Sequence, residues 1–177
     1  MSDHLSKQFD RELENISSRI LQMGTLVERQ VLAAIEAFST GSAEASQRVI
    51  DGEREVDADE VGIDEDCTLL IARRQLAAGD LRLILAILRI VTDLERIGDK
   101  ACEIASMSRV LRLAGAQHLP RLTDLDHCGR LATDMLRAAL DSLAHRDVEA
   151  ARRVIGSDAA VDTTFNTILR QLLTYML

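Results

Sequence analysis

Apolar residues recur with helical spacing along five long stretches of this 177-residue chain, and this periodicity constrains the fold more than any other feature. Spacings of three and four residues place side chains on one face of an α-helix. The breaks between the stretches are short, and short connections make consecutive helices antiparallel. The expected helices lie near residues 5–39, 43–78, 80–113, 121–144 and 147–177. We therefore expect an all-α protein of five long helices.

The composition supports an all-α fold and excludes several other classes. Aromatic residues make up 2% of the chain, and it has one proline and no tryptophan, which disfavours sandwiches and barrels. We find neither a signal peptide nor a stretch apolar enough to span a membrane. Cys67, Cys102 and Cys128 are odd in number and far apart, which fits a reducing compartment. We expect a cytoplasmic protein.

The formal net charge is −8, and the acidic excess lies in one short segment. Residues 51–66 contain nine acidic residues and one arginine, so the rest of the chain is balanced. An acidic protein repels the phosphates of nucleic acids and of anionic lipids. We therefore expect no nucleic-acid partner, and membrane contact only indirectly through partner proteins.

The chain also contains an internal repeat. Residues 24–57 align without a gap with residues 129–162 at an offset of 105, with eleven identities in 34 pairs. Such self-similarity indicates a duplicated structural unit. We predict a first three-helix unit over residues 1–115 and a second unit over residues 116–177. Because the third helix begins near residue 80, its counterpart would begin near residue 185, so we expect the second unit to be truncated to two helices.

Two acidic residues of the third helix occupy an apolar position of the helical pattern. Glu95 belongs to a series with a spacing of seven whose other members are Leu81, Leu88 and Cys102. Asp99 follows Glu95 one turn later on the same side of the helix. Two carboxylates at a packed seam are costly unless they are protonated, paired or bound to a cation.

A second acidic pair, Glu60 and Asp64, has the same spacing and borders the apolar seam of the preceding helix. Because the two helices are antiparallel, the two pairs can meet. Oxygen ligands favour hard cations such as magnesium, calcium or manganese, and carboxylate clusters also hold iron. We predict a site for a divalent or trivalent metal ion, zinc included, formed by Glu60, Asp64, Glu95 and Asp99.

Two other interpretations remain open. In the first, the chain is a metal-free helical scaffold whose acidic helix binds a basic partner surface. Without a metal, Arg48, Arg73 and Arg74 could also neutralise the acidic residues as salt bridges. In the second, the chain is a carboxylate-bridged di-metal enzyme. Such enzymes use Glu-x-x-His motifs, and among the acidic residues only Asp124 precedes a histidine, His127, by three positions. We expect no enzymatic activity.

Four segments of the chain resemble the PhoU family of phosphate-signalling regulators. The most specific is Asp93-Leu94-Glu95-Arg96-Ile97-Gly98-Asp99. The others are Arg73-Arg74-Gln75 followed by Gly79-Asp80-Leu81-Arg82, Met23-Gly24 with Val27-Glu28, and Arg170-Gln171-Leu172-Leu173-Thr174-Tyr175-Met176. The resemblance implies tandem antiparallel three-helix bundles that bind metal through Glu/Asp-x-x-x-Asp motifs. Glu60, Asp64, Glu95 and Asp99 match these motifs.

The resemblance also implies a function. Proteins of this family are negative regulators of the phosphate-starvation response. They are thought to connect the high-affinity phosphate ABC transporter with a membrane-bound sensor histidine kinase, which they hold off when phosphate is plentiful. They are often dimeric. We expect an adaptor that is not a catalyst, with the transporter ATPase, the kinase and a second copy of the chain as partners.

The chain departs from the family pattern in three ways. Leu76 stands where the family usually has proline after Arg-Arg-Gln. Phe165 and Leu169 take the repeat positions of Glu60 and Asp64, which argues against a second metal cluster on the fifth helix. The second Glu-Arg-Ile-Gly-Asp helix is absent from the sequence. Apolar surface on the last two helices would then be open, and we expect a second copy of the chain to cover it.

Overall fold

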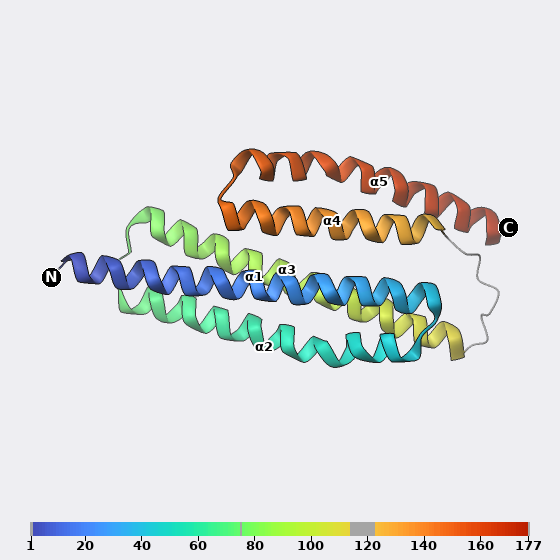
Figure 1. The fold of residues 1–177 in the computed structure, drawn as a ribbon, viewed down its shortest axis with the longest axis horizontal. Coiled ribbons are helices and arrows are strands. Elements are labelled where there is room, and N and C mark those ends of the chain that lie inside the picture. The colour runs from blue at the N-terminus through green and yellow to red at the C-terminus, as the bar shows by residue number, and fades with distance from the viewer. Residues whose placement is uncertain (1, 75, 114–122, 177) are drawn as a thin grey trace. The chain divides into compact units, whose positions relative to one another are not determined.

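The computed structural model describes residues 2–74, 76–113 and 123–176, and it confirms the all-α fold. All regular structure in these ranges is helical (Figure 1): α1 (Ser2–Thr40), α2 (Ala43–Arg73), α3 (Ala78–Leu113), α4 (Thr123–His145) and α5 (Val148–Met176). The largest difference from the expected bounds is at α2, which ends at Arg73 and not near residue 78, where α3 begins. No helix within the described ranges has an apolar run long enough to cross a membrane.

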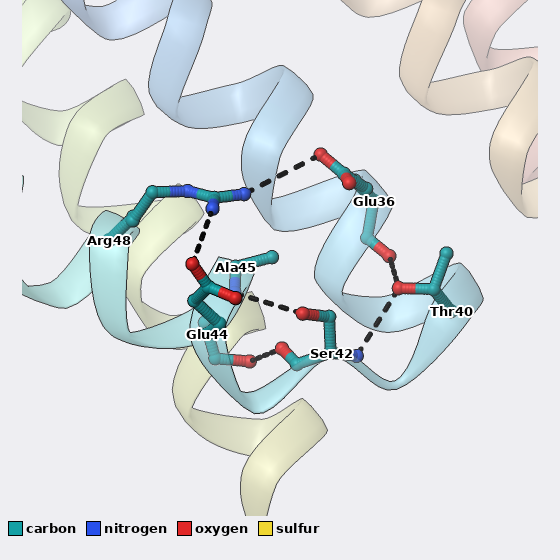
Figure 2. Close-up of polar contacts among 7 residues, drawn as sticks. Glu36, Thr40, Ser42, Glu44, Ala45 and Arg48 are labelled. Atoms are coloured by element: carbon teal, nitrogen blue, oxygen red, sulfur yellow. Dashed lines mark hydrogen bonds and ion pairs between the residues drawn. The ribbon is translucent and has the colours of Figure 1, made fainter.

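Polar caps fix the turn between α1 and α2 (Figure 2). Gly41 has a φ of 66°, a left-handed conformation that favours glycine after a helix end. The hydroxyl of Ser42 accepts a hydrogen bond from the backbone N–H of Ala45 at 3.1 Å and so caps the start of α2. The hydroxyl of Thr40 accepts a hydrogen bond from the N–H of Ser42 at 3.2 Å. These contacts let the chain reverse direction within two residues.

Helices α4 and α5 form an antiparallel hairpin (Figure 1). Asp147 caps α5, because its Oδ1 accepts a hydrogen bond from the N–H of Ala150 at 2.9 Å. Gly129 lets α4 approach α1, since a Cβ atom at this position would lie 2.5 Å from Cδ1 of Ile35. The cap therefore starts α5 directly after the turn, and the close approach at Gly129 packs α4 against α1.

The contacts divide the chain into two compact units that each contain parts of several helices. The first unit comprises residues 1–27 and 52–100, and the second comprises residues 28–51 and 101–177. The predicted boundary between residues 115 and 116 lies outside the described residues, and it stays a prediction.

The core of the first unit consists of apolar seams whose residues are spaced by three, four or seven. Each of the following side chains is at most 5% exposed: Ile16, Ile20, Met23 and Val27 on α1, Val56, Ile63, Cys67 and Leu70 on α2, and Ile84, Ile87, Val91 and Leu94 on α3. Full burial of such a side chain contributes about 1.5–3 kcal/mol. Seam packing is therefore the main source of stability in this unit.

The core of the second unit is built from smaller side chains. Ala34, Val49, Ala101, Cys102 and Ala105 form a buried cluster of residues from α1, α2 and α3. Small residues let helix backbones approach closely, and the hydroxyl of Ser108 on α3 donates a hydrogen bond to the carbonyl oxygen of Ala37 on α1 at 3.0 Å. This cluster fixes the register of α3 against α1.

One polar residue interrupts the buried seam of α1. Gln30 follows Val27 by three residues and precedes Ala34 by four, so it occupies a seam position, and it is 5% exposed. Neither its Nε2 nor its Oε1 has a hydrogen-bond partner among the described residues. Burying unsatisfied polar atoms costs about 1–3 kcal/mol. At the repeat position 105 residues later, the chain has Met135, an apolar side chain of similar size.

We predict that Gln30→Met raises the free energy of unfolding by about 1–2 kcal/mol, because it removes two unsatisfied polar atoms with little change in volume. Urea denaturation followed by circular dichroism measures the change. Gln22→Met is the matched control, since Gln22 is an exposed residue of the same helix and the change there should stay within about 0.5 kcal/mol. A destabilised Gln30→Met protein would show that Gln30 is satisfied in solution.

Candidate metal centre

Five carboxylates lie at or beside the buried seams of α2 and α3 in the first unit. Glu95 and Asp99 each follow a buried residue of α3, so their side chains emerge at the edge of its seam and are half-buried. Glu60 is half-buried and lies within the seam of α2, where it interrupts the apolar residues. Asp57 and Asp64 each follow a buried seam residue of α2 and are exposed. The core packing therefore positions these carboxylates along the line where α2 meets α3.

Three of these carboxylates converge. One carboxylate oxygen from each of Asp57, Glu95 and Asp99 lies within 4.8 Å of the other two. Ligands on opposite sides of a calcium-sized cation are separated by roughly 4.6–5.2 Å, because each bond is about 2.3–2.6 Å long. One ion could therefore contact all three side chains. The donor set consists of oxygen alone, which fits a hard cation.

The pKa of Glu95 is raised above the ordinary value of a glutamate. Partial burial is the largest cause, followed by the charge of Asp99, the charge of Glu60, a hydrogen bond with Asp99 and the charge of Asp57. The pKa of Glu60 is raised as well, by burial first and then by Asp57, Asp64 and Asp99. All the charges that shift these two pKa values belong to carboxylates. The site therefore favours a positive ion or a bound proton.

The structure brings together some of the predicted ligands. Glu95 and Asp99 belong to the converging group, and Glu60 lies close enough to raise the pKa of Glu95. Asp64 is exposed and lies outside the group of three, although its charge acts on Glu60. The assignment of the four predicted ligands stays a prediction.

Asp57 was missing from the predicted ligand set. It precedes Glu60 by three residues and Asp64 by seven, so it shares a flank of α2 with them. This spacing was a usable signal, but it gives only the face of the helix. The distance from Asp57 to the carboxylates of α3 depends on how far the two helices slide along each other.

Cys67 does not add a thiolate to the donor set. It is buried, and burial raises the pKa of its thiol to about 11, with further contributions from Asp64 and Asp66 that Arg19 partly offsets. The thiol is therefore protonated at neutral pH in the metal-free protein, and Cys67 lies outside the group of three converging carboxylates. This agrees with a site made of carboxylate oxygens.

Two of the three arginines proposed to neutralise the acidic residues have acidic partners elsewhere. Arg48 forms ion pairs with Glu44 at 3.5 Å and with Glu36 at 4.0 Å (Figure 2). Arg74 pairs with Glu12 of α1 at 3.2 Å and lies over the ring of Phe9. The metal-free interpretation stays open, but these two arginines pair with Glu44, Glu36 and Glu12 and not with the converging carboxylates.

Comparisons with known proteins point to one family. The PhoU domain family matches residues 20–107 and 125–177 of this chain. The chain is 43% identical over 174 residues to a phosphate-specific transport system accessory protein PhoU homolog of Burkholderia sp, covering 98% of this chain and 74% of that protein. It is 40% identical over 177 residues to the accessory protein PhoU of Escherichia coli (strain K12), covering 100% of this chain and 73% of that protein.

Two crystal structures have the same fold. PhoU from Pseudomonas aeruginosa superimposes with a TM-score of 0.89 at 39% identity, and the match covers 95% of this chain and 80% of that chain. The phosphate transport system regulatory protein PhoU from Streptococcus pneumoniae superimposes with a TM-score of 0.85 at 25% identity, and the match covers 95% of this chain and 78% of that chain. The PhoU-like fold expected from the sequence is confirmed.

We predict that Glu95→Gln stabilises the metal-free protein at neutral pH and that the gain shrinks as the pH falls. The raised pKa of Glu95 means that the folded protein holds protons more tightly than the unfolded chain does. The contribution of Glu95 to the stability of the parent protein therefore rises as the pH falls from about 7 toward the ordinary carboxyl range. Like charges one turn apart cost about 0.2–0.5 kcal/mol, so the gain at about pH 7 should be of that size. Urea denaturation at about pH 7 and at a pH in the ordinary carboxyl range measures the difference in the free energy of unfolding between the two proteins.

We also predict that Mn²⁺ stabilises the parent protein more than it stabilises variants that lack a proposed ligand. At neutral pH, Mn²⁺ should stabilise the parent protein, because an ion that binds only the folded state raises the free energy of unfolding. It should stabilise Glu95→Gln and Asp99→Asn much less. Asp93→Asn is the matched control, since Asp93 is an exposed residue of the same helix outside the converging group. Equal stabilisation of all four proteins would rule out these ligands.

Proposed function

Because this chain belongs to the PhoU family, we propose that it acts as an accessory and regulatory protein of phosphate uptake. The observation that carries this proposal is the identity of 40–43% over nearly the whole chain with proteins named as phosphate-specific transport system accessory proteins. The agreement with two PhoU crystal structures supports it. The chain is an all-helical adaptor in this proposal, and it acts through binding and not through catalysis.

The finer part of the proposal concerns the partners. The chain is a negative regulator of the phosphate-starvation response in the cytoplasm, and it reaches the membrane only through its partners. It connects the ATPase of a high-affinity phosphate transporter with a sensor histidine kinase and holds the kinase off when phosphate is plentiful. Three cysteines without disulfide bonds are consistent with a reducing compartment.

The metal has a structural or sensory part in this function. Asp57, Glu95 and Asp99 would hold a divalent or trivalent ion, with Glu60 close by. The ion would offset the repulsion between these carboxylates and tie α2 to α3. The predicted ligand Asp64 would join the site only if its exposed side chain turned toward the ion. Oxygen ligands fit magnesium, manganese and iron, and zinc also remains a candidate.

Binding to the two proposed partners tests the adaptor role. We expect the immobilised chain to retain both the purified transporter ATPase and the purified sensor kinase. In cells that lack their own regulator, the chain should lower a phosphate-starvation reporter when phosphate is abundant. Retention of neither partner, together with an unchanged reporter in cells that accumulate the folded protein, would overturn the proposal.

A second copy of the chain is the remaining proposed partner, and the exposed side of α5 supports it. Five large apolar side chains of α5 are 44% to 76% exposed: Val148, Ile155, Phe165, Leu169 and Leu173. Their repeat positions on α2 are Ala43, Ile50, Glu60, Asp64 and Thr68. Ile50 packs against the cluster that includes Ala101 and Cys102 of α3. Of these α2 positions only Ile50 packs against another helix, whereas Ile155, its counterpart on α5, is 76% exposed.

We predict that the chain is a dimer in solution and that the double variant Phe165→Ser, Leu169→Ser is a monomer, because serine removes the apolar surface that a second copy would cover. Size-exclusion chromatography with light scattering measures the mass. Val61→Ser is the control, since Val61 is an exposed apolar residue of α2. A parent protein that stays monomeric and does not aggregate at high concentration would contradict the prediction.

A further inference from the structure

One side of α3 combines exposed apolar residues with acidic residues in a continuous row. Residues 81, 85, 88, 92, 95 and 99 follow one another at alternating spacings of four and three, so they share one side of the helix. The row begins with Leu81, Leu85 and Leu88 and ends with Glu95 and Asp99. We refer to these six positions as the α3 stripe. At 1.5 Å per residue it is about 27 Å long.

The apolar half of the α3 stripe is open to solvent. Leu81 is 39% exposed and Leu85 is 45% exposed, and Leu88 is half-buried. The buried seam of α3, which includes Ile84 and Ile87, lies on an adjacent side of the helix, so the core of the unit does not need the leucines of the stripe. Apolar side chains in a row beside polar ones are typical of a surface that binds another protein.

The other half of the α3 stripe is acidic, and α2 adds to its negative charge. Glu60 of α2 acts electrostatically on Glu95, and so does Asp57. Two arginines of α3 have partners off the stripe: the guanidinium of Arg82 donates a hydrogen bond to the carbonyl oxygen of Ala78 at 3.2 Å, and Arg96 pairs with Asp93 at 3.4 Å. The stripe therefore presents apolar contacts at one end and a concentrated negative charge at the other.

We propose that the α3 stripe binds a basic amphipathic helix of a partner protein. The partner helix would place apolar side chains on Leu81, Leu85 and Leu88, and it would place lysine or arginine side chains two to four turns further on, against Glu95 and Asp99. A helix suits the surface because the stripe is straight and its residues recur with helical spacing. The charge complementarity excludes nucleic acids and anionic lipids, whose phosphates the carboxylates repel.

The surface does not depend on the proposed metal, but it shares carboxylates with it. A cation held by Glu95 and Asp99 would neutralise the charge that attracts the basic end of the helix. Metal and partner helix should therefore compete, and metal should weaken partner binding without abolishing the apolar contacts. Binding in the absence of metal distinguishes a failure of the docking surface from a failure of the metal site.

A synthetic helix of about 24 residues tests the surface on the full chain. Its leucines follow the spacing of the stripe and its lysines occupy the corresponding later turns. Fluorescence anisotropy with the labelled peptide, in the absence of metal, measures affinity. Leu85→Ser should weaken binding about tenfold, because it removes a central apolar contact. Leu83→Ser is the matched control: Leu83 is 43% exposed on the same helix but lies outside the stripe, and its substitution should leave affinity within about twofold.

The acidic half has its own test with the same peptide. The double variant Glu95→Gln, Asp99→Asn should weaken binding about tenfold and reduce its salt dependence, whereas Asp93→Asn should change neither. A peptide with glutamate in place of lysine should not bind the parent protein. Addition of Mn²⁺ should weaken binding of the lysine peptide to the parent protein, and circular dichroism verifies that each variant is folded.

Four results would overturn the proposal. One is an equal loss of affinity in Leu83→Ser and Leu85→Ser. Another is a loss of binding only on Phe165→Ser, which would place the peptide on α5. A change of oligomeric state in Leu85→Ser would make a second copy of the chain the occupant of the stripe. Binding of the parent protein to anionic vesicles that Leu85→Ser abolishes would make the occupant a lipid surface.

Discussion

The packing of α2 against α3 depends on apolar seams, and these seams hold the carboxylates beside them close together. Burial of Val56 and Ile63 on one helix and of Val91 and Leu94 on the other fixes the two helices side by side within the first unit. Residues that follow a seam position by one emerge at its edge, so the same burial sets the positions of Asp57, Glu95 and Asp99. The hydrophobic contribution of each seam residue, about 1.5–3 kcal/mol, exceeds the repulsion of about 0.2–0.5 kcal/mol between two carboxylates one helical turn apart. The fold therefore tolerates the acidic cluster and makes it available to a cation or a basic partner.

The duplicated unit uses the same geometry with different chemistry. The side of α2 that carries Glu60 and Asp64 corresponds on α5 to Phe165 and Leu169, both of which are more than 40% exposed. An acidic side attracts cations and basic groups, whereas an apolar side gains free energy only by excluding water. The two halves of the chain are therefore suited to different contacts, although their helices descend from one repeat.

The sequence identified Glu95 and Asp99 because they interrupt an apolar pattern on a helix that already has a charged side. Asp57 could not be found in this way, since it stands in a run of acidic residues where none is out of place. Its role depends on how α2 and α3 lie against each other. Helical periodicity shows which face of a helix carries a residue, but it does not show which residues of a neighbouring helix lie opposite. The spacing of Gln30 from Val27 and Ala34 indicates a seam position, but only the structure shows that its side-chain atoms have no hydrogen-bond partner among the described residues.

The sequence alone determined the number of helices, their approximate ends, the repeat and the resemblance to PhoU, because helical periodicity, glycine and capping residues act over a few neighbouring positions. The expected and observed ends differ most at α2, which ends at Arg73 and not near residue 78. Only the tertiary structure decided which carboxylates converge, which leucines of α3 stay exposed and which polar side chain is buried. These properties depend on how whole helices are shifted and rotated against each other. Many side chains that are far apart in the sequence determine these relative positions together.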